Sequence, residues 1–456
     1  MESFGILITI FVYLLTVLLI GLYYSKKNES TSDFYLGGRK LGPFVTAMSA
    51  EASDMSSYLL MGLPGLAYLS GIADVGWTVI GLAAGTYLNW LFTAKRLRRY
   101  TQVTNSVTLP QFFSDRFHDK KAILTAISAL IIVIFFIPYT ASGFAACGKL
   151  FSTLFGMDYV TAMVISAIII VGYTAAGGFL AASITDFIQS IVMTIAIVFI
   201  LVFATIQAGG IGAVIENAQS LPGYFSLTSE YLPATGEAGS YGFLRICSTL
   251  AWGLGYFGMP HILLRFMAIK DESKLKLSRR VASVWVVIAM AIAVMIGVAG
   301  KAMSDAGIIG ALEGSNTETI IITISDYLSK FGFLPAIMAG LVMAGILAST
   351  MSTADSQLLA ASSSVSENLF RETFKLKISD KSAMLVARIT VVVISVIAVF
   401  LARNPDSSIF GIVSFAWAGF GAGFGPIMIC ALFWKRTNLP GAIAGMIAGG
   451  AMVFIW

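Results

Sequence analysis

Charged residues are scarce in this sequence. Only 12% of its 456 residues are Asp, Glu, Lys or Arg, whereas soluble proteins carry about 25%. Hydrophobic residues make up 57% of the chain, and the mean hydropathy is +0.86. A fold in water could not bury so much apolar surface, so the composition predicts a membrane protein with several spans.

Cysteine and histidine are also rare. Cys147, Cys247 and Cys430 lie in apolar runs without metal-ligand spacing, which favours small buried hydrophobic residues. His118 and His261 are the only histidines and form no catalytic cluster. The sequence therefore favours neither an enzyme nor a protein with an organic cofactor.

Apolar segments long enough to span a bilayer occur twelve times along the chain. They are residues 6–24, 43–70, 75–94, 122–150, 158–177, 184–208, 242–264, 280–302, 333–364, 384–402, 407–434 and 439–456. Basic residues gather in alternate loops, such as Lys26 and Lys27 after the first segment and Arg265 after the seventh. The positive-inside rule then places the N-terminus outside, and the net charge of +5 indicates topology, not nucleic-acid binding.

Two acids interrupt the second apolar segment in the stretch "AEASDMSSY", residues 50–58. An acid at mid-membrane costs about 2.5–3.5 kcal/mol on insertion scales, which a bound cation would offset. We therefore favour a functional role for Asp54 over a structural hydrogen bond. For Glu51, three residues earlier on nearly the same helical face, a functional acid and a partly hydrated structural acid are both open.

Hydroxyl groups recur at spacings of three and four in the ninth segment. Ser349, Ser352, Thr353 and Ser356 could face the helix that carries Asp54. Na⁺ prefers hydroxyl oxygens and carbonyls freed where a helix unwinds, and unwinding is expected near Ala52 and Met55. Each hydroxyl could instead bond a carbonyl one turn earlier, but the set together favours an ion site.

Aromatic residues mark the seventh segment, "AWGLGYFGMPHILLRF". Trp252, Tyr256 and Pro260 recur every four residues and would share one helical face. They could line a pocket for a small solute or form a packing stripe, and the sequence leaves both open. Asp186 could pair with a basic loop residue or assist ion release, while Arg39 is interpreted as a solvated loop charge.

Five stretches carry a resemblance to a known family. They are "DFYLGGRKLGPFVTAMSAEASDMSSYLLMGLPG", "GGFLAASITDFIQS", "WGLGYFGMPHILLRFMA", "MSTADSQLL" and "SFAWAGFGAGFGP". From about Val12 to Trp456 the chain resembles the sodium:solute symporter family, most closely its proline-importing bacterial members. The chain departs from that pattern at Glu51, Ser57 and Tyr58, beside the expected substrate pocket.

The resemblance implies an all-α multi-span membrane protein. Its core would be a five-plus-five inverted repeat with an extra N-terminal helix and at least one C-terminal helix. The implied units are 1–42 (N-terminal helix and cytoplasmic loop), 43–209 (first repeat), 210–241 (extracellular loop), 242–434 (second repeat) and 435–456 (C-terminal helix). The family usually has one more span, so we expect that the last unit could be truncated.

The resemblance also implies roles for individual residues. The sodium ligands would be Ala52, Met55, Ser349, Ser352 and Thr353. The substrate-binding residues would be Ser56, Ser57, Tyr139, Trp252, Tyr256 and Pro260. The coupling or ion-path residues would be Asp54, Glu51, Asp186 and Arg39.

The expected function is sodium-coupled import of L-proline by alternating access. Na⁺ is then the co-transported ion, the bilayer of the bacterial cytoplasmic membrane is the surrounding partner, and the monomer is the functional unit. Symport of another small solute, such as pantothenate or a betaine, is the alternative, followed by a solute channel or sensor.

Overall fold

The computed structural model describes residues 2–25 and 30–455, and they are almost entirely helical. Lys26, Lys27 and Trp456, which entered the topology prediction, lie outside the described residues. The long helices are α1 (Glu2–Ser25), α8 (Ile123–Phe155), α9 (Tyr159–Gln207), α13 (Leu275–Asp305), α15 (Phe333–Ser363), α16 (Asp380–Leu401), α17 (Ile409–Phe433) and α18 (Leu439–Ile455).

Three further spans are interrupted helices. They are α3 (Pro43–Ser57), η2 (Tyr58–Gly62) and α4 (Leu63–Ser70); α5 (Ile72–Leu88), η3 (Asn89–Thr93) and α6 (Ala94–Val103); and α11 (Phe243–Leu250), η4 (Ala251–Gly258) and α12 (Pro260–Ala268). The shorter elements are α2 (Thr31–Leu36), η1 (Gly37–Arg39), α7 (Leu109–Phe117), α10 (Ile211–Ser220), η5 (Glu272–Lys274), η6 (Gly314–Thr319), α14 (Ile320–Ser329) and η7 (Ser364–Thr373).

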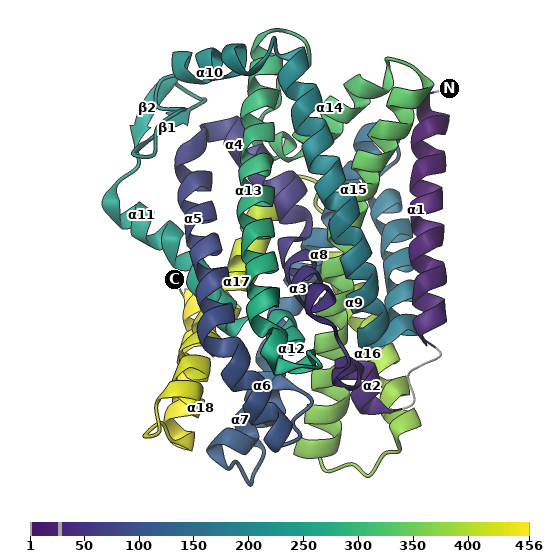
Figure 1. Cartoon of the computed structure of the whole chain (residues 1–456), viewed down its shortest axis with the longest axis vertical. Helices are drawn as coiled ribbons and strands as arrows, with labels where there is room; N and C mark the ends of the chain where they lie inside the picture. The colour runs from purple at the N-terminus through teal and green to yellow at the C-terminus, as the bar shows by residue number, and fades with distance from the viewer. Residues whose placement is uncertain (1, 26–29, 456) are drawn as a thin grey trace.

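The helices bear out the multi-span prediction. Seven helices in the described parts of the chain are long and apolar enough to cross a membrane. Within the described residues, each of the twelve apolar segments expected from the sequence lies on helical structure. In Figure 1, α2, α6 and α7 lie at one end of the bundle, whereas α10 and the strands β1 (Ser229–Leu232) and β2 (Glu237–Ser240) lie at the other. Loops predicted to share a side of the membrane are therefore together in space.

Several elements outside the spans were not anticipated. The loop 210–241 contains α10 and an antiparallel hairpin of β1 (Ser229–Leu232) and β2 (Glu237–Ser240). The segment after α13 contains η6 and α14, whose isoleucines at 320, 321, 322 and 324 are fully buried. These elements are short and their apolar faces meet other helices only in the folded protein, so hydropathy over a full span could not reveal them.

Helix α15 occupies the centre of the bundle. It packs against α1, α3, α8 and α9, and its residues from Val342 to Ser363 are almost all buried. Small residues allow this approach: a Cβ at Gly345 would lie 2.6 Å from the Ala196 side chain of α9. The polar middle of α15 is thus held inside protein and away from lipid, which is where polar groups in a membrane are tolerated.

Breaks in helices occur at defined residues. Helix α3 is interrupted at Ser56, whose φ of 47° and ψ of −170° are not helical. The expected unwinding near Ala52 and Met55 is therefore confirmed, and the residue with non-helical backbone angles is Ser56, directly after Met55. The fifth and sixth apolar segments form one element, α9, with a break at Gly178 (φ 71°, ψ −179°). A glycine permits this backbone at no steric cost.

The element α11–η4–α12 is broken in a similar way. Residues Ala251–Gly258 form a 3₁₀ helix, and Met259 is extended before Pro260 begins α12. A proline at this position needs no N–H bond, so it suits the start of a helix. Trp252, Tyr256 and Pro260 consequently do not share one α-helical face, because the four-residue argument assumed a continuous α-helix.

Candidate functional site

Oxygen atoms of α3 and α15 meet at the centre of the bundle. The Ser352 hydroxyl donates to the Ala52 carbonyl at 2.8 Å and lies 3.2 Å from the Ser349 carbonyl. The Thr353 hydroxyl donates to the same Ser349 carbonyl at 3.0 Å. All four residues are at most 3% exposed. The cluster presents only carbonyl and hydroxyl oxygens, which suit a hard cation.

Met55 is less directly connected to this cluster. Its carbonyl accepts a hydrogen bond from the Tyr58 amide, within the interrupted helix itself. Ser56, the residue at the break, accepts a hydrogen bond from that amide with its side chain at 3.1 Å. The structure therefore brings together four of the five predicted sodium residues and places the fifth one helical turn away.

Asp54 lies where the two interrupted helices α3 and α11–η4–α12 cross. Its Oδ2 accepts a hydrogen bond from the Tyr256 hydroxyl at 2.5 Å. The Tyr139 hydroxyl donates to the Asp54 backbone carbonyl at 3.1 Å, and the indole N–H of Trp417 donates to that hydroxyl at 3.1 Å. Within the described residues the Asp54 Oδ1 has no partner, although the side chain is buried. A buried carboxylate oxygen without a donor favours a cation nearby.

Aromatic rings surround a narrow cavity beside Asp54. Trp252 lies 5.5 Å from Tyr58 and 6.3 Å from Trp417, measured between ring centroids, and Tyr256 lies 5.0 Å from Trp417. The free volume is only about 10 Å³, room for about one water molecule. These side chains must therefore separate before a solute larger than water can enter.

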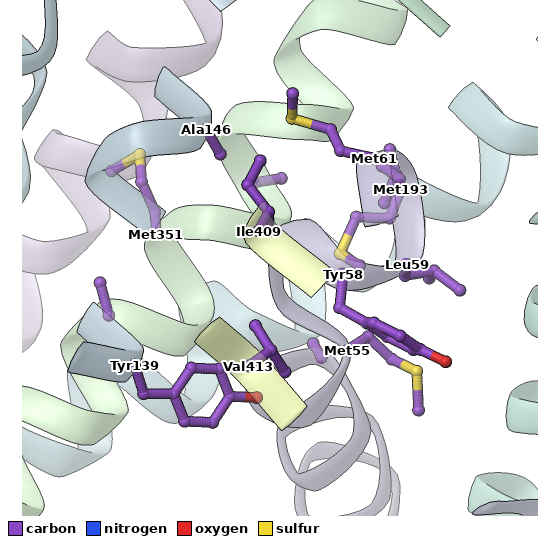
Figure 2. Packing of buried hydrophobic residues seen from close by; sticks show 14 of the residues in the cluster. Met55, Tyr58, Leu59, Met61, Tyr139, Ala146, Met193, Met351, Ile409 and Val413 are labelled. Atoms are coloured by element: carbon purple, nitrogen blue, oxygen red, sulfur yellow. The ribbon is translucent and has the colours of Figure 1, made fainter. Parts of the chain in front are cut away.

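A second narrow cavity borders the break in α3 at Ser56. It is lined by Ser56, Ser57, Tyr139, Thr140, Ser142, Gly143, Thr350, Thr353, Ala354 and Gln357. Figure 2 shows Tyr139, which lines this cavity, together with Met55, Tyr58 and Val413, which line the cavity beside Asp54. Five of the six predicted substrate residues thus border the two cavities or bond Asp54, whereas Pro260 lines neither cavity.

Two contributors to this region were missed. Trp417 belongs to the stretch "SFAWAGFGAGFGP", yet its position gives no hint that it meets Tyr139 and Tyr256. Gln357 accepts a hydrogen bond from Thr140 at 3.1 Å. Its position one turn after Thr353 was the one available signal, because residues four apart share a helical face.

Glu51 is fully enclosed. It is 1% exposed, and its Oε1 accepts a hydrogen bond from the Trp90 indole at 3.0 Å. Its Oε2 has no partner in the described chain. The interpretation of Glu51 as a partly hydrated acid is therefore wrong, since α3 places it in the interior against η3.

Asp186 forms a buried ion pair with Arg265. The guanidinium lies 3.0 Å from the carboxylate, and both residues are at most 1% exposed. Ser49 of α3 donates to the same carboxylate at 2.7 Å. The prediction that Arg265 is a loop charge is wrong, because helix α12 continues to Ala268 and turns this side chain inward.

Arg39 is also not a solvated loop charge. It donates to the carbonyls of Met267 at 2.7 Å, Thr101 at 2.8 Å and Ser106 at 2.7 Å. Burial, with a smaller contribution from the nearby Arg98, lowers the pKa of Arg39 to about 10. Arg39 therefore ties η1 to the ends of α6 and α12, and the interpretation as a free topology charge is wrong.

Comparison with known proteins gives the family. The profile of the Sodium:solute symporter family matches residues 34–449. The chain belongs to the sodium:solute symporter family. Sodium is accordingly the co-transported ion, and membership in a family of symporters agrees with the expectation that the chain is not an enzyme.

Curated members of this family match the chain along its length. The osmoregulated proline transporter OpuE of Bacillus subtilis is 42% identical over 100% of this chain and 89% of its own length. The high-affinity proline transporter PutP of the same organism is 42% identical over 96% of this chain and 89% of its own. The sodium/proline symporter of Escherichia coli is 41% identical over 100% of this chain and 88% of its own.

A solved structure shares the fold. It is a substrate-bound, outward-open Na⁺-coupled sialic acid symporter, with a TM-score of 0.79 and 20% identity. The match covers 100% of this chain and 99% of the other. This likeness confirms the predicted fold class of a multi-span symporter.

Proposed function

We propose that this symporter imports L-proline together with Na⁺ by alternating access. The single observation that carries the proposal is the crossing of two interrupted helices at Asp54, beside an all-oxygen cluster on α15. Interrupted helices at mid-membrane are where transporters of this kind bind ion and solute. The proline-transporting names of relatives 41–42% identical over nearly the whole chain support the choice of solute.

The ion is proposed to bind between α3 and α15. The backbone oxygens of Ala52, Met55 and Ser349 and the hydroxyls of Ser352 and Thr353 would coordinate it. Ser352 already joins the two helices through its 2.8 Å bond to Ala52. A cation here would strengthen that junction and order the segment just before the break at Ser56.

The solute is proposed to bind beside this junction. The apolar ring of proline suits the rings of Trp252 and Tyr256, and the hydroxyls of Ser56, Ser57 and Tyr139 can bond its charged groups. Pro260 would act indirectly, by starting α12 after the extended Met259. Binding requires the narrow cavity beside Asp54 to widen, as alternating access demands.

Coupling follows from a shared set of residues. Because Ala52 and Ser56 lie on one short segment, ordering by either ligand raises the affinity for the other by the same factor. Asp54 would supply the charge that favours Na⁺ entry. Glu51, three residues earlier on α3, would be a second acid on the ion path. Asp186 and Arg39 are proposed to act nearer the inner end. The membrane potential contributes about 2.3 kcal/mol per charge per 100 mV.

The proposed arrangement in the membrane follows the loops. The first half would comprise residues 43–209, the second half residues 242–434, with 210–241 as an outer loop and 435–456 as a C-terminal helix. Helices α6 and α7, with their basic residues, would face the cytoplasm, so the N-terminus would be outside. The protein would work as a monomer in the bacterial cytoplasmic membrane.

Uptake by proteoliposomes tests this function. Labelled L-proline should accumulate when an inward Na⁺ gradient is applied, and Asp54→Asn should abolish accumulation. Asp326→Asn, which changes an exposed acid paired with Lys330, is the matched control and should transport normally. Accumulation without Na⁺, or in Asp54→Asn, would contradict the ion assignment.

A competition panel tests the solute separately. Excess unlabelled proline should block uptake, whereas pantothenate and betaine should not. Efficient block by either compound, with weak block by proline, would move the assignment to another small solute. Solute flux that equilibrates but never accumulates would instead indicate a channel.

A further inference from the structure

An open pocket lies at the α6–α7 end of the molecule, far along α17 from the site at Asp54. Its free volume is about 740 Å³, and its walls come from α6, α7 and the C-terminal end of α17. Figure 1 shows α6 and α7 at the lower end of the bundle, beside α18. The pocket therefore opens where spanning helices end, at the level expected for the membrane surface.

Cationic side chains dominate the polar part of this pocket. Arg96, Arg99, Arg116 and Lys435 all line it. Arg99 is paired with Glu272 at 2.7 Å. For the other three, the described residues provide no ion pair, so three positive charges face the pocket without an acidic partner.

Arg96 and Arg116 are held in place by the end of α17. Arg116 donates through Nε to the Ala431 carbonyl at 2.7 Å, and Arg96 approaches the Leu432 carbonyl at 3.5 Å. Capping carbonyls at a helix C-terminus is a sufficient structural reason for an arginine. That capping role does not explain the other N–H donors of these two guanidinium groups. It also does not explain Lys435, which is not needed for the cap.

Exposed aromatic side chains complete the pocket. Phe433 is 43% exposed and Trp434 is 58% exposed, and the Arg96 guanidinium lies 4.3 Å above the Phe433 ring. Aromatic rings next to basic residues at the end of a spanning helix are typical of the membrane interface. The pocket thus offers positive charge to a phosphate and apolar surface to the glycerol and acyl chains attached to it.

We propose that this pocket binds the headgroup of an anionic phospholipid. The phosphate would contact Arg96, Arg116 and Lys435, and the acyl chains would leave along the lipid-facing side of α17. Under the proposed topology this lipid belongs to the cytoplasmic leaflet, where basic pockets between helices recognise anionic headgroups. One lipid would then connect α6, α7 and α17, elements from the two proposed halves of the transporter.

Lipid binding to the full-length purified protein tests this assignment. Short-chain dioctanoyl phosphatidylglycerol should bind in a neutral detergent and raise the unfolding temperature, whereas dioctanoyl phosphatidylcholine and inorganic phosphate at equal concentration should not. The variant Arg96→Gln/Lys435→Gln should weaken phosphatidylglycerol binding about 30-fold. Each basic residue near the membrane surface adds a similar attraction to an anionic headgroup, and this variant removes two of them.

A matched control separates the pocket from general surface charge. Lys95→Gln/Arg436→Gln removes the same charge from the two residues next to the pocket, neither of which lines it. This control should bind phosphatidylglycerol as the unmodified protein does. Equal weakening in both double variants would overturn the pocket, and saturation by inorganic phosphate alone would indicate a small-anion site instead of a lipid site. Both variants should keep Na⁺-dependent uptake, so a failure here is distinguishable from failure of the transport proposal.

Discussion

Replacing Arg265 by methionine should destabilise the protein severely. Arg265 pairs with Asp186 at 3.0 Å, donates to Ser49 at 3.0 Å and lies 4.9 Å from the centre of the Phe179 ring. Through the Ser356 hydroxyl it also reaches Asp355, a second buried acid. Methionine fills similar space but leaves both acids without a cation.

The expected loss follows from the buried charges. Removing one partner of a buried pair costs about 3–5 kcal/mol of unfolding free energy, because the remaining charge is uncompensated. Asp186→Asn should cost less, about 1–3 kcal/mol, since Arg265 keeps Ser356 and the nearby Asp355. Arg265→Met/Asp186→Asn should be no worse than Arg265→Met alone, because Asp186 no longer carries a charge that needs Arg265.

Equilibrium unfolding in detergent–denaturant mixtures measures all three variants against the unmodified protein. The reasoning is refuted if Arg265→Met loses less than about 1 kcal/mol, which is the size of an ordinary substitution. It is also refuted if the loss in the double variant equals the sum of the two single losses. Additivity would mean that the two side chains contribute independently and that the ion pair is not the source of the stability.

Two further predictions test other parts of the structure. A Cβ at Gly258 would lie 2.1 Å from a backbone carbonyl oxygen, whereas one at Gly172 meets nothing within 4 Å. Gly258→Ala should therefore lower the free energy of unfolding by about 1–3 kcal/mol or more, whereas Gly172→Ala should leave it unchanged. Thermal unfolding measures both variants, and equal losses would be inconsistent with the close approach at Gly258. Trp417→Phe removes the hydrogen bond to Tyr139 and should raise the KM for proline uptake roughly 3- to 10-fold, while an unchanged KM would remove Trp417 from the proposed pocket.

The chain's own sequence determined its class and the position of its spans. Hydropathy is a local property, so segments such as 122–150 and 384–402 could be read directly and lie on α8 and α16. A buried acid and a run of hydroxyls are unusual in apolar sequence, so Asp54 and Ser352 were identifiable as well. Both were found because lipid makes polar groups costly wherever they occur.

Only the tertiary structure decided which of these groups meet. Asp54 and Tyr256 are 202 residues apart, and Asp186 and Arg265 are 79 apart. No local pattern encodes such pairs, because they depend on how whole helices pack. For the same reason Arg265 looked like a loop charge: it directly follows the seventh apolar segment, but α12 continues to Ala268 and its side chain is buried inside the protein.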